Sequence, residues 1–291
     1  TADGGKTWSS VAVTTVDEEL AKSYSAKAHM AFADGLHGWV NFKLTSSSNF
    51  SLGKLFATSD GGRSWLRLPD PPAGDEIRFF SATEGWLAGG PGGDRLYVTR
   101  DGGGTWTRQE VAAPPELPEG HAAYDLPVFH NRESGLLPVT FVGSESATLM
   151  LYRTDNRGES WEPSASFSGL EGIGFGGKAA TFVSDSRLLL LAVTRGKDLV
   201  LRRFAAATTS MTSVRNPVPG SAVRKLQFVG EAGWLLLSTG HCTDHKQDCS
   251  QRTELYATAD GGGTWQDVTP PFDAAWESKG EALRARYAVR L

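Results

Sequence analysis

The sequence predicts an all-β fold, and three observations lead to this prediction. An eight-residue pattern, Thr-x-Asp-x-Gly-x-Thr/Ser-Trp, recurs along the chain, and we call each copy a box. A second element precedes most boxes: a strand ending in Phe, a short polar turn, and a strand opening with Gly-Trp or Gly-Leu. The 291 residues include 34 Gly and 14 Pro, which suits a turn-rich chain. Repeats of roughly 40 to 55 residues that each supply four strands are typical of propeller blades. We therefore expect a β-propeller of four-stranded antiparallel blades.

Five boxes are recognisable, each with an acceptor residue and a tryptophan. The pairs are Asp3 and Trp8, Asp60 and Trp65, Asp101 and Trp106, Asn156 and Trp161, and Asp260 and Trp265. The tryptophans are separated by 57, 41, 55 and 104 residues. Because the last interval is about twice the others, we expect a degenerate copy near residues 205–213.

The residue types in a box are those of a tight turn between two strands. Asp-Gly between β-prone flanks is a hairpin signal, because Gly adopts positive φ without steric cost. The Asp side chain accepts hydrogen bonds from backbone N–H groups of the turn, and Asn156 can do the same. The Trp ring then covers the hairpin. The acids lie one blade apart and cannot converge on one ligand, so we expect the boxes to be structural.

The chain is expected to form a single propeller domain over residues 1–291. Complete blades are predicted near residues 27–70, 75–112, 124–165, 175–216 and 222–269. The segment WSSVAV near the N-terminus resembles an outer strand, and EALRARYAVRL at the C-terminus resembles an innermost strand. Joining them would close the last blade and remove exposed sheet edges. We therefore predict six blades, with seven as the alternative, and interpret the chain as a fragment. A short helix is expected within residues 15–24.

The predicted layout sorts the loops onto two faces. The boxes share one face with the turns that precede Gly-Trp. The opposite face carries the longer connections, residues 14–27, 45–54, 110–123, 164–174 and 239–253. Long loops on a rigid scaffold are where binding residues tend to lie. A protein or glycan ligand is therefore expected on this long-loop face.

Composition narrows the choice of partners. The formal net charge of −4 argues against a general nucleic-acid surface. No apolar run approaches the roughly 20 residues of a membrane-spanning helix, and LLLLAV at residues 188–193 is interpreted as a buried strand. We expect neither a nucleic-acid partner nor a membrane span in this chain.

The box pattern resembles the Asp-box, or bacterial neuraminidase repeat. Sialidase is the best-known activity of Asp-box proteins, and that resemblance implies three carboxylate-binding arginines and an Arg-Ile-Pro motif. The sequence has no Arg-Ile-Pro, and Ile77-Arg78-Phe79 has the order wrong. A retaining glycosidase would also need two carboxylates about 5 Å apart, and no such pair stands out. A glycoside hydrolase is therefore the alternative interpretation.

A second resemblance covers nearly all of the chain. The segment FFSATEGWLAGGPGGDRLYVTRDGGGTW, from Phe79, is similar to the repeat of the photosystem II assembly factor family and its non-photosynthetic relatives. That resemblance implies an exported, extracytoplasmic, non-catalytic platform that binds proteins without a cofactor. The sequence lacks the concentrated arginine patch of the photosystem factors, so the partner stays open.

The two cysteines, Cys242 and Cys249, lie in the segment HCTDHKQDC. A disulfide closing this loop would fit an exported protein. A zinc site of Cys242, His245 and Cys249 is the alternative. The spacing of the cysteines suits a loop staple and matches no standard zinc pattern, so we predict the disulfide and no metal, with His241 and His245 exposed.

Basic residues recur three positions before the aromatic residue of some innermost strands. They are His29 before Phe32, Lys225 before Phe228 and Arg284 before Tyr287, whereas the same count gives Ile77 and Leu126 in other blades. One interpretation is a basic lining of the axial channel that favours an acidic ligand. The other is a set of solvated charges at the channel mouth.

Overall fold

The computed structural model describes residues 26–44, 52–113, 121–129, 131–170, 173, 178, 180–183, 188–195, 198–205, 210–214, 222–229, 231–242 and 249–269. For the fourth sheet and parts of the fifth, introduced below, only the backbone is described. Several predicted features lie outside these residues: the first box with Asp3 and Trp8, the helix within residues 15–24, Arg284, and both terminal strands.

The described residues form five antiparallel sheets, each made of strands consecutive in the chain. The first sheet contains β1 (Ala26–Phe32), β2 (Gly38–Leu44), β3 (Leu52–Thr58) and β4 (Leu66–Arg67). The second contains β5 (Glu76–Phe79), β6 (Gly85–Gly89), β7 (Arg95–Thr99) and β8 (Thr107–Gln109). The third contains β9 (His121–Tyr124), β10 (Val128–Phe129), β11 (Gly135–Val142), β12 (Ala147–Thr154) and β13 (Glu162–Leu170). The fourth contains β14 (Ala180–Val183), β15 (Leu188–Arg195), β16 (Asp198–Ala205) and β17 (Ser210–Val214). The fifth contains β18 (Ala222–Val229), β19 (Ala232–Cys242), β20 (Cys249–Thr258) and β21 (Gln266–Asp267).

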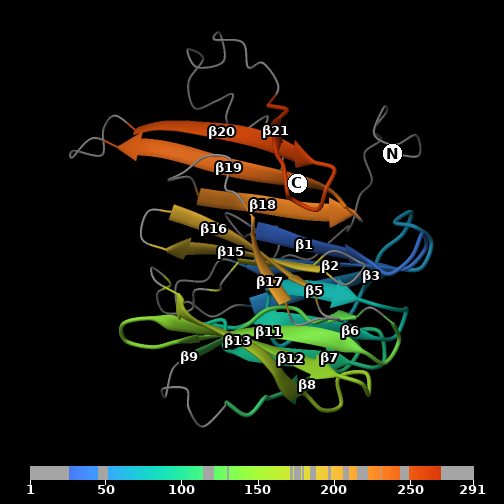
Figure 1. Ribbon diagram of the computed structural model, residues 1–291. Coiled ribbons are helices and arrows are strands. Elements are labelled where there is room, and N and C mark those ends of the chain that lie inside the picture. Colours follow the sequence, from blue (N-terminus) through green and yellow to red (C-terminus); the bar gives the residue numbers. More distant parts are fainter. Residues whose placement is uncertain are drawn as a thin grey trace.

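The sheets are arranged like the blades of a propeller. The first strand of one sheet lies against the first strand of another: β1 contacts β5, and β14 contacts β18. Figure 1 shows the third sheet and the fifth sheet at opposite ends of the view, with the first sheet between them. The prediction of an all-β, propeller-like fold is confirmed. No helix within the described ranges has the length and apolarity that crossing a bilayer would require.

The first strand of the third sheet departs from the pattern expected from the sequence, because it is broken into β9 and β10. Tyr124 lies opposite Val139, and Val128 lies opposite Leu136. Three residues, 125–127, therefore face two residues, 137 and 138, which makes a bulge. Proline cannot donate to a sheet ladder, and both Pro127 and Pro138 fall here, so the strand cannot pair continuously.

Packing between sheets depends on the tryptophan of the Gly-Trp element. Trp39 of β2 stacks on Phe79 of β5, with ring centroids 3.7 Å apart and an interplanar angle of 3°. Trp86 of β6 belongs to the core shared with the third sheet. Both rings are buried, whereas the box rings such as Trp65 and Trp106 are only half-buried. The sequence analysis expected each box ring to cover its hairpin, whereas the tryptophans buried between the sheets are those of the Gly-Trp elements.

The degenerate box expected near residues 205–213 falls at the turn between β16 and β17. Its central residues, 206–209, lie outside the described part of the chain. β16 and β17 themselves pair in antiparallel register, with Leu201 opposite Val214. The fourth sheet therefore has the strand order of the others, β14-β15-β16-β17.

Candidate binding site

The described boxes are turns whose side chains bond to their own backbone. In the first sheet, Asp60 Oδ1 accepts a hydrogen bond from the Ser64 N–H at 2.9 Å, and Oδ2 accepts one from the Ser64 hydroxyl at 2.6 Å. The Thr58 hydroxyl donates to Asp60 Oδ1 at 2.8 Å. These bonds, those from Ser64 first, hold the pKa of Asp60 well below its usual range. Asp101 and Asp260 make the same bonds in their own turns.

The first threonine of each described box has a role that the sequence interpretation missed. The Thr58 hydroxyl accepts the Gly62 N–H at 2.9 Å, and the Thr99 hydroxyl accepts the Gly103 N–H at 2.8 Å. Thr154 and Thr258 repeat this bond, and all four threonines are buried. The available signal was that every recognisable box begins with Thr. The turn is therefore closed from two sides, by the acceptor residue and by the threonine.

The fourth recognisable box keeps this geometry with an amide in place of a carboxylate. Asn156 Oδ1 accepts the Ser160 N–H at 3.0 Å. Its Nδ2 group donates to the Ser160 hydroxyl at 2.9 Å, so the direction of that bond is reversed relative to the Asp boxes. The turn accommodates a neutral acceptor without changing its backbone bonds.

Each described box is also tied to the Gly-Trp turn of the same sheet. The Gly61 N–H donates to the Leu36 carbonyl at 2.9 Å, and the Gly102 N–H donates to the Thr83 carbonyl at 2.8 Å. The third and fifth sheets repeat this bond from Arg157 to Glu133 and from Gly261 to Glu231. The two kinds of turn therefore lie at the same end of each of these sheets. The carboxylates there are committed to their own turns and face no common pocket.

A charged cluster joins the second and third sheets at this end. Glu84 forms ion pairs with Arg100 and with Arg157, the latter at 2.7 Å. Arg100 also donates to the Arg157 carbonyl at 2.8 Å. The cluster bridges neighbouring sheets, and each of its charges has a partner of opposite sign.

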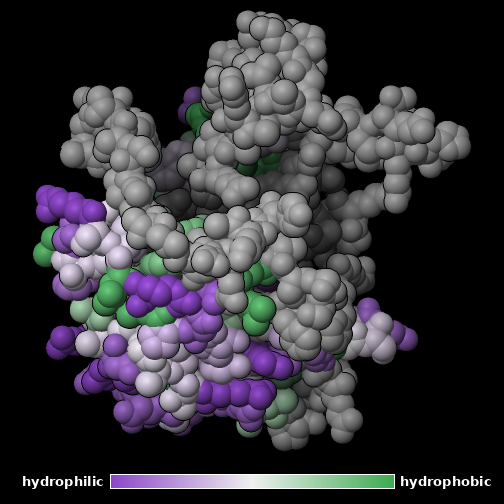
Figure 2. Space-filling model, turned by 180° about the vertical axis from the view of Figure 1, so that it is seen from behind, coloured by the Kyte–Doolittle hydropathy of each residue, from purple (hydrophilic) through white to green (hydrophobic). Residues whose placement is uncertain are grey.

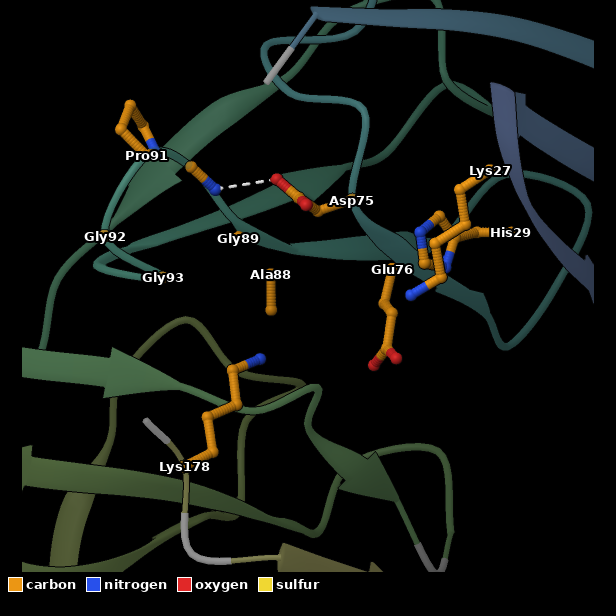
Figure 3. Close-up of a pocket in the computed structure, with 11 residues that line it drawn as sticks. Lys27, His29, Asp75, Glu76, Ala88, Gly89, Pro91, Gly92, Gly93 and Lys178 are labelled. Carbon is orange, nitrogen blue, oxygen red and sulfur yellow. Dashed lines mark hydrogen bonds between the residues drawn. The ribbon is translucent and has the colours of Figure 1, made fainter. Parts of the chain in front are cut away.

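A pocket of about 360 Å³ lies at the other end of the first and second sheets. Its ionisable lining consists of Lys27, His29, Asp75, Glu76 and Lys178, and residues 88–93 supply a glycine-rich rim. Figure 3 shows that Lys27 and His29 approach from one side of the pocket and Lys178 from another. The volume falls at the lower end of the range for small-ligand pockets, about 300 to 1,000 Å³.

Asp75 fixes one wall of this pocket. Its Oδ2 accepts the Gly90 N–H at 2.9 Å, drawn as a dashed line in Figure 3. Its Oδ1 pairs with Lys43 Nζ at 2.6 Å, and its carbonyl accepts from the Asn41 amide at 2.9 Å. Two bonds from β2 and one from Gly90, which follows β6, hold this residue. The Asp75 carboxylate therefore stabilises the pocket wall and is not available to bind a ligand.

The register of β5 corrects the sequence count along the innermost strands. Phe79 lies opposite Gly85, just as Phe32 lies opposite Gly38. The residue equivalent to His29 is therefore Glu76, not Ile77, which is buried between the sheets. Counting back from Phe80 gives Ile77, but the equivalent of Phe32 is Phe79, one residue earlier. His29 and Glu76 both line the pocket, so its lining is mixed in charge rather than basic.

The surroundings of His29 lower its pKa and so favour the neutral imidazole. Burial lowers its pKa below the usual value, and the positive charge of Lys27 lowers it further. Glu76 and Asp75 oppose this shift, while Lys43 adds to it. The cations left in the lining are Lys27 and Lys178, and Lys178 Nζ lies 3.7 Å from Asp125 Oδ1.

A half-buried arginine lies beside these groups. Arg78 of β5 donates to the Pro127 carbonyl at 3.1 Å. Burial lowers its pKa, and the neighbouring Glu76 and Asp125 act in the opposite direction. In the sequence, Arg78 was noted only because Ile77-Arg78-Phe79 differs in order from Arg-Ile-Pro. Nothing in the sequence indicated that Arg78 connects the second and third sheets.

For the remaining predicted site residues, the structure describes the backbone alone or does not describe the residue. Lys225 lies on β18, whose backbone alone is described, and Arg284 and His245 lie outside the described residues. Cys242 and Cys249 are direct partners at the end of the β19–β20 ladder. Directly opposed residues have Cα atoms about 4.5 to 5.5 Å apart, within the range of a disulfide. The Cys242–Cys249 bond remains a prediction.

The described surface on one side of the molecule mixes residue types. Figure 2 shows strongly hydrophilic side chains next to hydrophobic ones on the face turned away in Figure 1. The exposed apolar residues include Met30, Phe32 and Trp234. Among the described residues, no group of three or more His, Cys, Asp or Glu side chains could hold a metal ion.

Comparison with known proteins gives one partial match in sequence. The chain is 33% identical over 149 residues to the photosystem II assembly lipoprotein Ycf48 of Synechococcus sp. (strain CC9902). The match covers 46% of this chain and 35% of that relative, so it spans about a third of the relative's length. No family model matches the chain.

Two solved structures have similar outlines at low sequence identity. The SapL1 lectin in complex with alpha methyl fucoside has a TM-score of 0.48 at 12% identity, covering 85% of this chain and 81% of the lectin. The α-L-arabinofuranosidase Arb93A of Fusarium graminearum, in complex with an iminosugar inhibitor, has a TM-score of 0.42 at 13% identity, covering 84% of this chain and 81% of the enzyme. We draw no functional conclusion from these two likenesses.

Proposed function

We propose that the chain is a non-catalytic propeller that acts as an exported scaffold for protein binding or assembly. The observation that carries the proposal is the 33% identity to an assembly lipoprotein over 149 residues. The same comparison supports an extracytoplasmic location, because that relative is named a lipoprotein. The match covers only part of both chains, so the partner of this protein is a separate question.

The pocket between the first and second sheets is the part of the described surface that suits such a partner. Lys27 of β1, Glu76 of β5 and Lys178, which lies outside the strands, line it. Neither Lys27 nor Glu76 forms an ion pair with another described residue. A polar protein segment with charges of both signs would complement this lining, and complementary charges contribute to specificity.

The boxes belong to the framework rather than to the binding site. Their acceptors bond within their own turns, and their backbone N–H groups bond to the adjacent Gly-Trp turn. We propose a single six-bladed domain whose last blade is closed by the two termini, and a Cys242–Cys249 disulfide that staples the β19–β20 loop. These proposals rest on the box repeat and on the register of the two cysteines.

A charge-reversal experiment tests the binding proposal. The double variant Lys27→Glu, Lys178→Glu should lose the partner that the wild-type chain crosslinks in its native host. Arg63→Glu is the matched control, because Arg63 is an exposed cation in a box turn at the opposite end of the first sheet. Equal loss with both variants would contradict a binding role for the pocket.

Hydrolysis is the outcome that would overturn the scaffold function. The purified chain is not expected to release sugar from glycoside substrates. If it does, and if Glu76→Gln abolishes the release, the glycoside hydrolase interpretation replaces the scaffold. Glu76 is the informative position because its carboxylate lines the pocket without an ion-pair partner among the described residues.

A further inference from the structure

The pocket at the end of the first and second sheets receives two lysine side chains. Lys27 of β1 and Lys178, which precedes β14, both line it, and Figure 3 shows them reaching towards the same space from opposite sides. Lys27 is exposed. Lys178 Nζ lies 3.7 Å from Asp125 Oδ1, which is longer than the roughly 2.7 to 3.2 Å of an N–H···O hydrogen bond. Both ammonium groups can therefore bind a further acceptor.

The carboxylates beside these lysines differ in how they are bonded. Asp75 accepts from Lys43 Nζ at 2.6 Å and from the Gly90 N–H at 2.9 Å. Glu76 is exposed and lines the pocket, and it forms no ion pair with another described residue. Glu76 therefore offsets the charge of the two lysines only in part, because one carboxylate faces two ammonium groups.

The described charges around the pocket sum to an excess of one positive charge while His29 is neutral. There are four cations and three carboxylates, namely Lys27, Lys43, Arg78 and Lys178 against Asp75, Glu76 and Asp125. Complementary charge favours specific binding. A ligand group with a single negative charge would balance the pocket, whereas a doubly charged phosphate would leave it with an excess of negative charge.

His29 supplies a further positive charge when it is protonated. It is half-buried, and it lies two residues from Lys27 on the same side of β1. Burial and the charges of Lys27 and Lys43 disfavour the imidazolium, whereas Glu76 and Asp75 favour it. A bound anion would also favour the imidazolium, so anion binding and protonation of His29 should strengthen each other.

We propose that the pocket binds one carboxylate of the partner between Lys27 and Lys178, and that protonation of His29 strengthens this binding. The inference rests on the proposed binding function and adds the chemistry of the group that enters the pocket. The volume of about 360 Å³ admits a side chain or a chain end rather than a folded surface. The carboxylate therefore belongs to an acidic side chain or to a C-terminus.

NMR titration of the purified chain with acetate tests this assignment. Acetate should bind more tightly at about pH 5.5 than at about pH 7.5, because the protonated fraction of His29 rises over this range while the acetate carboxyl stays mostly ionised. The His29 ring should titrate at a higher pH with acetate than without it. An unchanged His29 midpoint at saturating acetate would overturn the proposal, as would tighter binding of inorganic phosphate than of acetate at about pH 7.5.

Charge variants separate binding in the pocket from binding elsewhere on the surface. At about pH 7.5, Lys27→Gln and Lys178→Gln should each weaken acetate binding by up to about fivefold, the loss expected for one partly exposed ion pair. Glu76→Gln should strengthen it by removing a repelling charge, a gain that a purely structural role of Glu76 does not predict. Arg63→Gln, at the opposite end of the first sheet, is the matched control. Equal weakening by Arg63→Gln and Lys27→Gln would contradict the site.

Capped peptides identify the source of the carboxylate. Acetyl-Gly-Gly-Gly with a free C-terminus carries a chain end, acetyl-Gly-Glu-Gly-amide carries a side chain, and acetyl-Gly-Gly-Gly-amide is the neutral control. Tighter binding of either acidic peptide supports the proposal, and equal binding of the neutral peptide would overturn it. If no carboxylate binds but Lys27→Glu, Lys178→Glu still loses the crosslinked partner, the carboxylate assignment fails and the scaffold function stands. If carboxylates bind but that variant keeps the partner, the pocket's role in partner binding fails instead.

Discussion

The two ends of the first and second sheets are built on different principles. At the box end, the same hydrogen bonds recur from sheet to sheet: acceptor to Ser or Thr, threonine to glycine, and box to Gly-Trp turn. At the pocket end, an equivalent position carries different residues: His29 of β1 corresponds to Glu76 of β5.

This difference distinguishes a repeated, structural end of the sheets from a variable end. The bonds repeated in every described box close a hairpin and connect it to the adjacent Gly-Trp turn, which each of these sheets requires. A position that changes from sheet to sheet, such as that of His29 and Glu76, has no such structural role, and residues of either charge occur there. Breaking the repeated end should therefore cost stability, whereas changing the variable end should alter binding and ionisation.

The largest loss in the free energy of unfolding is expected for Trp86→Ala. Truncating a fully buried Trp typically costs about 3 to 5 kcal/mol, because it leaves a cavity that the surroundings fill only in part. Trp106→Ala should cost clearly less, since that ring is half-buried. Urea unfolding of the two variants provides the measurement. A larger loss for Trp106 would return the main packing role to the box tryptophans.

Removing the box acceptor should destabilise the protein less than Trp86→Ala does, and removing only its charge should destabilise it less still. Asp101→Ala removes the acceptor of the Thr105 N–H and hydroxyl bonds, which is expected to cost about 1 kcal/mol. Asp101→Asn should cost less than Asp101→Ala, because Asn156 already closes the equivalent turn. Equal destabilisation by Asn and Ala in chemical unfolding would contradict this account of the box.

Acid stability should report on the same carboxylates. Bonds from the Thr264 N–H and hydroxyl, and from the Thr258 hydroxyl, lower the pKa of Asp260 to about 2. An unfolded Asp titrates near 3.9, so the unfolded chain binds more protons in this window and the stabilisation is lost as pH falls from about 4 towards 2. Melting temperatures of Asp260→Asn should therefore depend less on pH in this range than those of the wild type. A parallel pH dependence would argue against the carboxylate's role.

The smallest effect on stability is expected from the ionisation of His29 in the pocket. Because the pKa of folded His29 lies below the unfolded value of about 6.5, the unfolded chain binds more protons, and stability should rise slightly with pH up to that value. NMR titration of the His29 ring should give a midpoint below 6.5, and Lys27→Ala should raise it by removing a repelling charge. Glu76→Gln should lower it. A shift of the opposite sign in either variant would mean that the pocket charges are arranged differently.

The sequence by itself determined the repeated features. Box residues act within eight positions, so their turn chemistry is local, and the alternation of Gly-Trp elements with boxes was enough to predict four strands per sheet. It also predicted that box and Gly-Trp turns share one end. These features depend on short-range contacts, which a sequence pattern records directly.

Only the tertiary structure decided what crosses from one sheet to the next. The register of β5 assigned Glu76 rather than Ile77 to the channel position, because a shift of one residue reverses which side chains face inward. The burial of Trp39 and Trp86 depends on boxes some 60 to 75 residues further along the chain, where Gly102 and Gly158 lie. The pocket likewise combines β1, β5, the β6–β7 turn and Lys178, which no local pattern connects. Contacts of this kind depend on how the sheets pack, and a single sequence carries no direct record of that packing.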